Sequence, residues 1–216
     1  MSNSNALFNE EILNISITNF YKSVTNINFT TYLKNQITSR GSYMSKANRT
    51  KVIIFAAMMA ALTNILSLDF LVIPIIIGPF ASKIHISQLA ILVSGIFAGP
   101  LSGLLTGAIG GIYMSYSVSI PFVIGGLALL GFSAGLFTKR LKLRPFISSI
   151  LAWCVQAPYV LITDYVWFVY SRLMPPGVAL TVITTILINL TVEAIIASIL
   201  AEIIVHYLKR TGLTIG

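Results

Sequence analysis

The chain has 216 residues, of which 56% are hydrophobic and only 9% are charged, and its formal net charge is +8. Soluble domains carry about a quarter charged residues, and several apolar runs here approach the ~20 residues that a helix needs to cross a bilayer. The composition therefore predicts an integral membrane protein and excludes an ordinary soluble domain. The single cysteine, Cys154, excludes an intramolecular disulfide and a Cys-based zinc site, and we expect no metal or cofactor.

Residues 1–43 differ from the rest of the chain, because they are rich in Asn, Ser and Thr and hold no apolar run long enough for a signal peptide or a span. We interpret them as an N-terminal extension, either disordered or the product of a mis-assigned start, since Met44 opens a basic leader directly before the first apolar run. The alternative is an amphipathic regulatory segment. The scattered apolar residues that favour it are Leu7, Phe8, Ile12, Leu13, Ile15 and Phe20.

Residues 44–216 are predicted to form an all-α integral membrane domain, a bundle of six transmembrane helices. The expected spans are 52–68, 85–98, 101–117, 120–138, 145–170 and 178–206. Pro100, Pro121 and Pro145 suit the first turn of a new helix. The segment 69–84 contains two prolines and a glycine, so it is too broken for a helix, yet it is too apolar for a solvated loop. We expect it to fold back over the bundle.

The basic residues near the ends of the spans predict the orientation in the membrane. With both termini in the cytoplasm, nine basic residues lie inside: Lys46, Arg49, Lys51, Lys139, Arg140, Lys142, Arg144, Lys209 and Arg210. Only Lys83 and Arg172 then lie outside. We therefore expect a multi-pass protein of the cell membrane with cytoplasmic N- and C-termini. Membrane orientation explains the positive charge better than nucleic-acid binding does, and no nucleic-acid partner is expected.

Small residues at helical spacing predict close packing of helices in the bilayer. The second, third and fourth spans carry glycines every four residues: Gly95, Gly99, Gly103, Gly107 and Gly111, then Gly131 and Gly135. The first span carries a flat alanine patch that is suited to docking a partner helix, made of Ala56, Ala57, Ala60 and Ala61.

A polar side chain inside a span costs free energy unless it is hydrogen-bonded or in contact with water, so each is a candidate functional residue. At 100° per residue one face of the fifth span carries Trp153, Gln156, Val160, Asp164 and Trp167. A ladder at four-residue spacing on the sixth span carries Thr181, Thr185, Asn189 and Glu193. These two faces are predicted to enclose a polar substrate pocket, and its rim is expected to include Tyr113, Tyr116 and His85.

Asp164 and Glu193 are the strongest of these candidates, because no basic residue lies at either depth, so each carboxyl must be protonated, hydrogen-bonded or exposed to water. The aromatic candidates have a simpler interpretation as interfacial belt residues, and Asn189 as a hydrogen bond between helices. A G-x-S-x-G motif around Ser133 resembles that of hydrolases. Ser133 lies within a helix-length apolar run, which disfavours a catalytic nucleophile there, so we do not expect an enzyme.

Together these features resemble the substrate-binding S component of energy-coupling factor (ECF) transporters over about residues 44–210. The resemblance rests on six expected spans, on the alanine stretch Ala56–Ala61 (AAMMAA), on the apolar segment after it, and on the hairpin Gln88–Gly107 (QLAILVSGIFAGPLSGLLTG). It implies an outward-facing pocket for a vitamin or related micronutrient. It also implies a transmembrane T component, contacted through Ala57 and Ala61, and two separate ATPase subunits as partners.

The resemblance leaves the substrate open, because the chain has neither the N-terminal histidine of the nickel and cobalt branch nor a matched signature for thiamine, biotin or riboflavin. The alternative is a stand-alone membrane protein, either a homo-oligomeric small transporter or an assembly factor, whose glycine faces bind further copies of itself.

Overall fold

The structure is a computed structural model that describes residues 46–68, 73–77 and 80–212. By its internal contacts the chain divides into Met1–Met44 and Ser45–Gly216, and every described residue belongs to the second unit. The expectations for residues 1–43 lie outside the described residues.

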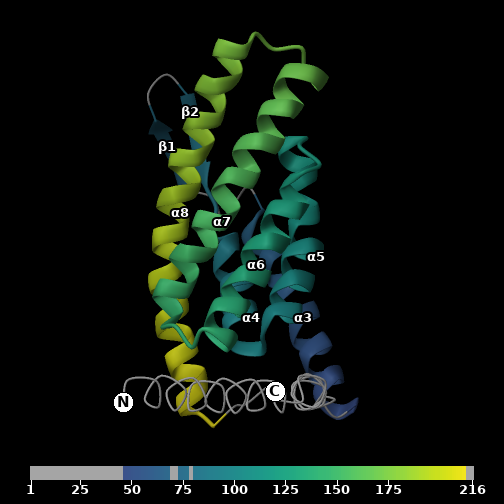
Figure 1. The fold of residues 1–216 in the computed structure, drawn as a ribbon, viewed down its shortest axis with the longest axis vertical. Coiled ribbons are helices and arrows are strands. Elements are labelled where there is room, and N and C mark those ends of the chain that lie inside the picture. The colour runs from purple at the N-terminus through teal and green to yellow at the C-terminus, as the bar shows by residue number, and fades with distance from the viewer. Residues whose placement is uncertain (1–45, 69–72, 78–79, 213–216) are drawn as a thin grey trace, which may run out of the picture. The chain divides into compact units, whose positions relative to one another are not determined.

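The described residues form six helices and one hairpin (Figure 1). The helices are α3 (Lys46–Leu66), α4 (Ser87–Ala98), α5 (Pro100–Val118), α6 (Val123–Arg140), α7 (Pro145–Val166) and α8 (Pro176–Arg210). A short π-helical turn, η2 (Trp167–Ser171), continues α7. Each range expected to form a span overlaps one of these helices. Pro100 and Pro145 begin α5 and α7 as expected, whereas Pro121 lies in the turn before α6.

The helix α4 lies in the interior of the bundle, where it packs against α3, α5, α6 and α8. All of its residues except Leu89 are buried. Its sequence is apolar around the whole circumference, which is typical of a helix covered on every side. With 12 residues it is only ~18 Å long, so it does not extend the full length of the bundle. Ser87 and Gln88 in its first turn are each 1% exposed, so its N-terminus lies within the bundle, and this position matters for the site.

The segment after α3 departs from the expected all-α fold. It forms an antiparallel hairpin of β1 (Ile73–Ile77) and β2 (Phe80–Ile84), in register from Ile73 opposite Ile84 to Ile77 opposite Phe80. The β-branched isoleucines of β1 and the proline at 74 favour extended backbone over helix. The strand β2 contacts α8, so the expectation that this segment folds back on the bundle is confirmed. The hairpin adds two short strands to a membrane domain whose other described elements are helical, as expected.

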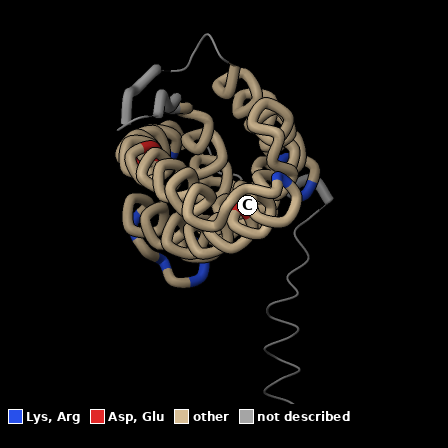
Figure 2. Tube along the Cα trace, turned by 90° about the horizontal axis from the view of Figure 1, so that it is seen from above, with Lys and Arg blue, Asp and Glu red and all other residues tan. Residues whose placement is uncertain are grey.

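Four helical segments among the described residues are long and apolar enough to cross a membrane, and together they identify a membrane protein: Arg49–Leu66, Val123–Arg140, Pro145–Ser171 and Pro176–Arg210. The start of α3, the connection from α6 to α7 and the end of α8 lie at one end of the bundle (Figure 1). We call this the basic end, since the sequence places Lys and Arg at all three points. Viewed along the bundle, the basic residues gather in groups toward its rim (Figure 2).

Glycines bring the backbones of α4, α5 and α6 into direct contact, as their spacing predicts. A Cβ atom added to Gly103 would meet the carbonyl oxygen of Gly131, and one added to Gly131 would meet that of Gly103. A Cβ on Gly95 would likewise meet the Gly131 carbonyl, and one on Gly107 that of Leu127. Only glycine permits such close approaches. In lipid no hydrophobic effect drives helices together, so this close packing is what stabilises their association. Gly99 acts differently: its φ of 103° lets the chain turn from α4 into α5.

Candidate functional site

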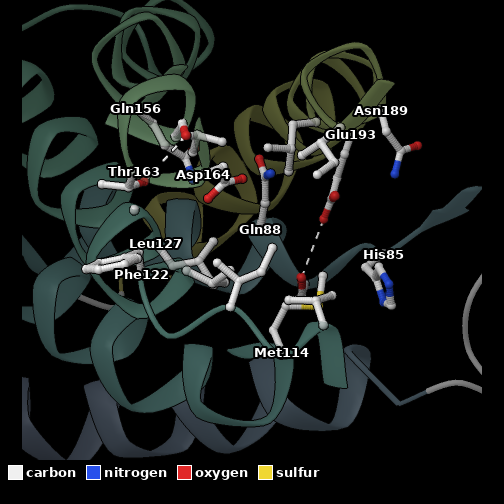
Figure 3. Close-up of a pocket in the computed structure, with 18 of the residues that line it drawn as sticks. His85, Gln88, Met114, Phe122, Leu127, Gln156, Thr163, Asp164, Asn189 and Glu193 are labelled. Carbon is white, nitrogen blue, oxygen red and sulfur yellow. Dashed lines mark hydrogen bonds between the residues drawn. The ribbon is translucent and has the colours of Figure 1, made fainter. Parts of the chain in front are cut away.

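A cavity of about 450 Å³ is lined by residues of α5, α6, α7 and α8 and of the first turn of α4 (Figure 3). This volume lies within the ~300–1,000 Å³ range of small-molecule sites. Its lining mixes a few polar groups with apolar side chains. The lining residues are His85, Ser87, Gln88, Met114, Ser117, Val118, Ile120, Phe122, Val123, Gly126, Leu127, Gln156, Val160, Thr163, Asp164, Val182, Thr185, Ile186, Asn189, Leu190 and Glu193.

The wall formed by α7 carries Gln156, Val160 and Asp164, which lie on one face because they are four residues apart. Only 3% of Gln156 and 4% of Asp164 is exposed. The Oε1 atom of Gln156 is buried without a hydrogen-bond partner among the described residues. An unmade hydrogen bond on a buried amide costs about 1–3 kcal/mol. This wall therefore offers polar groups whose hydrogen bonds the described protein does not complete.

The wall formed by α8 carries Thr185, Asn189 and Glu193, so three of the four members of the predicted ladder face the cavity. The fourth, Thr181, is exposed and does not line it. Of the three that face the cavity, Glu193 lies farthest along α8 from the N-terminus of that helix, and only 2% of its surface is exposed. Its carboxylate accepts hydrogen bonds from the backbone N–H of Gln88 and from the Ser87 hydroxyl, the latter at 3.4 Å. Both donors belong to the first turn of α4.

The floor of the cavity is the N-terminus of α4. Ile86, the residue before the helix, provides no side-chain cap. Gln88 projects from this floor, and Figure 3 shows its side chain drawn between those of Asp164 and Glu193. Both amide atoms of Gln88 are buried and have no hydrogen-bond partner among the described residues. An unpartnered amide of this kind, placed in a cavity, is suited to a ligand that offers both a donor and an acceptor.

The structure thus brings together seven of the twelve residues that the sequence placed on the two faces and the rim of the pocket. They are His85, Gln156, Val160, Asp164, Thr185, Asn189 and Glu193. The other five, Tyr113, Tyr116, Trp153, Trp167 and Thr181, do not line this cavity.

Tyr113 and Tyr116 lie instead in a separate apolar groove between α3 and α5, together with Asn64. The side-chain oxygen of Asn64 accepts a hydrogen bond from the backbone N–H of Tyr113, and its amide nitrogen donates to the carbonyl of Ile109. This clamp holds α3 against the face of α5 that carries the tyrosines. Tyr116 is 84% exposed, as an interfacial aromatic residue would be.

The two tryptophans of the predicted stripe lie beyond the two ends of the cavity. Trp153 packs against the apolar cluster of α4, α6 and α8 that includes Ile96 and Leu130. Trp167 packs its ring edge-on to Phe122, with the ring centroids 6.0 Å apart, and Phe122 does line the cavity. Trp167 therefore supports the wall through Phe122.

The connection between α5 and α6 closes one side of the cavity and is held by residues of α7 and its extension. The Arg172 guanidinium donates to the carbonyl of Ser119 at 3.4 Å and lies 6.0 Å from the centre of the Trp167 ring. The Tyr159 hydroxyl donates to the carbonyl of Phe122, also at 3.4 Å. These bonds place Phe122 and Ile120 at the cavity.

Sequence reasoning missed the floor and much of the apolar wall of the cavity. The missed residues with polar side chains are Ser87, Gln88, Ser117 and Thr163. A signal for Gln88 was present, since an amide at the start of an apolar run is as costly in a bilayer as those of the other spans. The position of Gln88 in the cavity depends on where the hairpin returns the chain to the bundle, which no periodicity shows.

The alanine patch of α3 is divided by the fold. Ala56 and Ala60 are each 1% exposed and face the bundle, where the carbonyl of Ala56 accepts a hydrogen bond from Thr106. Ala57 and Ala61 are exposed on the opposite side. Only the second pair is accessible to a partner in this structure.

A model of the protein family described as the S component of ECF-type riboflavin transporters matches residues 47–210. The chain belongs to this family. It is therefore a substrate-binding membrane subunit of a micronutrient uptake transporter and not an enzyme. Consistent with this, Ser133 of the hydrolase-like motif lies within α6 and donates its hydroxyl to the carbonyl of Leu129 at 2.6 Å.

Two solved structures are similar to this S component. One is described as the S component of a bacterial ECF transporter; it is 20% identical, covers 76% of this chain and 95% of its own, and has a TM-score of 0.47. The other is described as the S component for biotin from an ECF-type ABC transporter, with 20% identity, coverage of 77% and 95%, and a TM-score of 0.49. No match is found among the curated proteins.

Proposed function

We propose that the chain binds riboflavin in the cavity between α7 and α8 and presents it for uptake. The family to which the chain belongs is described by this substrate. The observation that carries the proposal is a pair of buried amides in the cavity lining: both amide atoms of Gln88, and Oε1 of Gln156, have no hydrogen-bond partner among the described residues.

Riboflavin matches this lining chemically. One edge of its flat ring system alternates carbonyl acceptors with an imide N–H donor, which is the pattern that an amide side chain complements. The ring faces are apolar and suit walls such as Phe122, Leu127 and Val160. Its hydroxylated side chain offers donors to a carboxylate such as that of Asp164.

The test is a titration of the purified protein in detergent, following the quenching of riboflavin fluorescence. We expect saturable one-site binding. The Gln88→Leu and Gln156→Leu variants should each bind about five- to 150-fold more weakly, because each removes about 1–3 kcal/mol of hydrogen bonding. Thr191→Val is the matched control: Thr191 lies on α8, bonds the carbonyl of Leu187 and does not line the cavity, so its affinity should stay unchanged.

Absence of saturable binding by the folded parent protein would contradict riboflavin as the substrate. Binding that survives both glutamine replacements would place the site elsewhere in the bundle.

For the membrane arrangement, the proposal is that all six helices belong to the transmembrane domain, with both termini in the cytoplasm. The support is that three segments rich in Lys and Arg lie at the same end of the bundle (Figure 1). They are the start of α3, the connection between α6 and α7, and the end of α8. Basic residues flanking spans favour the cytoplasmic side. The cavity then opens toward the outside, near the connection between α7 and α8.

For the partners, the proposal is that the exposed alanines of α3, Ala57 and Ala61, contact a transmembrane T component, to which two ATPase subunits supply energy. Small residues on an exposed helix face allow another helix to approach closely. The neighbouring side chains on this face, Ile54, Met58 and Ile65, are at least half exposed and apolar, as suits a surface covered by lipid or by another membrane subunit.

A further inference from the structure

The sequence around the start of α4 provides no cap for the first turn of this helix. Backbone N–H groups in the first turn of a helix have no partners within the helix itself. A polar side chain just before the helix usually accepts one of them, but Ile86 has no polar side-chain atom and makes no such bond. Ser87 and Gln88 are each 1% exposed, so bulk water does not supply the acceptor. This terminus therefore requires an acceptor from another part of the fold.

Glu193, on α8, provides that acceptor. The Gln88 backbone N–H donates to its carboxyl group, and the Ser87 hydroxyl donates to its Oε1 atom at 3.4 Å, the dashed line at Glu193 in Figure 3. Gln88 is the second residue of α4, and the N–H of the second or third helical residue is the one that a capping side chain accepts. Glu193 thus acts as the N-cap of α4 from a different helix, 106 residues after Ser87 in the chain.

This cap does not require a charge on Glu193. A protonated carboxyl group keeps an oxygen that accepts hydrogen bonds, as the ionised group does. An amide side chain of the same length has such an oxygen as well. The arrangement requires only an acceptor at this position, whatever its charge.

The residue that Glu193 holds is also the residue whose side chain is available to a ligand. Gln88 lines the cavity, and both of its amide atoms are buried without a hydrogen-bond partner among the described residues. With no such bond on the amide, its place in the cavity depends on where the backbone of Gln88 lies. Hydrogen bonds need donor–acceptor distances of about 2.7–3.2 Å, so a backbone shift of ~1 Å would take this amide out of range of a bound ligand.

We propose that Glu193 is a positioning residue of the substrate site: by capping α4 from α8, it holds the Gln88 amide where the ligand meets it. The inference rests on the proposed function, because it takes this cavity as the riboflavin site. It explains why α8 presents a buried carboxyl group to the floor of the cavity, and it requires neither a charge on Glu193 nor its contact with the ligand.

The experiment is a riboflavin titration of purified variants in one detergent, followed by fluorescence quenching. Glu193→Met keeps the length of the side chain but removes the acceptor, so it should bind about three- to thirtyfold more weakly, the scale of one capping bond. Glu193→Gln retains an acceptor oxygen, so its affinity should stay within about twofold of the parent. Glu202→Met is the matched control: Glu202 also lies on α8 but does not line the cavity, and the parental affinity should remain.

A double-mutant cycle shows whether Glu193 acts through Gln88. In the Gln88→Leu background, Glu193→Met should cause no further loss of affinity, because the side chain that Glu193 positions is then absent. If Glu193→Met does not fold, Ser87→Ala gives the same comparison, since it removes one of the two donors to Glu193. It should weaken binding about two- to fivefold in the parent and not in the Gln88→Leu background. Melting temperatures separate loss of fold from loss of affinity.

Parental affinity in Gln88→Leu, or in the folded Glu193→Met variant, would overturn the inference. A further loss of affinity in the Gln88→Leu background would also overturn it, since Glu193 would then contact the ligand directly or support the whole site. Equal losses in Glu193→Met and Glu193→Gln would overturn it as well, because the acceptor alone would not be enough. In each of these cases riboflavin binding by the parent keeps the proposed function intact. If the folded parent does not bind riboflavin, the proposed function fails and the inference fails with it.

Discussion

Gly103 on α5 and Gly131 on α6 lie backbone to backbone, so that a Cβ atom on either one would collide with the carbonyl oxygen of the other. Gly95 of α4 approaches the same carbonyl, since a Cβ on Gly95 would also meet the oxygen of Gly131, so the three helices pack together at this point. This contact fixes the position of α4, and α4 in turn provides the floor of the cavity.

We predict that Gly131→Ala destabilises the protein by about 1–3 kcal/mol, the usual effect of adding a methyl group to a filled interior. The two nearest atoms are the backbone carbonyl oxygen and carbon of Gly103 on α5, which cannot yield as the end of a flexible side chain could, and the third is Cγ2 of Ile91 on α4. Thermal unfolding in a fixed detergent measures the change. Gly177→Ala is the control, since Gly177 in the first turn of α8 has no atom within 4 Å of an added Cβ. Equal melting temperatures for the two variants would contradict close packing of α5 and α6 at Gly131.

The glycine contacts among α4, α5 and α6 and the polar faces of α7 and α8 were predictable, because both depend only on helical periodicity. A spacing of four residues brings side chains to one face of any α-helix, and Gln156, Asp164 and Glu193 do meet in one cavity. What periodicity does not give is the rotation of each helix within the bundle or the depth at which each begins. Tyr113 faces α3 because Asn64 holds that face, and Gln88 reaches the cavity because α4 begins inside the bundle.

The division of the alanine patch leads to a prediction about assembly. Ala57→Leu and Ala61→Leu add bulk to an exposed face, so they should abolish uptake in cells that contain the complete transporter while leaving vitamin binding by the isolated protein nearly unchanged. Ala60→Leu is the contrasting variant: Ala60 is 1% exposed, so added bulk should lower the melting temperature and binding together. Lost binding with normal complex assembly in the Ala57 variant would assign this face to the pocket instead.

The topology is tested by labelling cysteines from either side of the membrane. Cys154 is exposed, so the parent for this experiment is Cys154→Ala. Leu141→Cys, between α6 and α7, should react with an impermeant maleimide only from the cytoplasm, and Leu173→Cys, between η2 and α8, only from outside. Both leucines are more than half exposed, so the reagent can reach each one. Reaction of both from the same side would rule out the proposed arrangement.

The two tryptophans of α7 provide a prediction that separates wall support from core packing. Trp167 holds Phe122 by an edge-on ring contact, and Phe122 lines the cavity. Aromatic pairs of this kind contribute about 0.5–1.5 kcal/mol, so Trp167→Ala should weaken riboflavin binding by about two- to tenfold. Trp153 packs against the apolar cluster away from the cavity, so Trp153→Ala should lower the melting temperature with a smaller effect on affinity.

Riboflavin titration and thermal unfolding of both tryptophan variants, in one detergent, give the comparison. A second measurement identifies the route of the effect, because Phe122→Ala alone and Phe122→Ala combined with Trp167→Ala should bind equally weakly if Trp167 acts through Phe122. A further loss of affinity in the double variant would mean that Trp167 contacts the ligand directly, as the sequence stripe first suggested. Loss of affinity in Trp153→Ala alone would instead extend the binding site toward the basic end of the bundle.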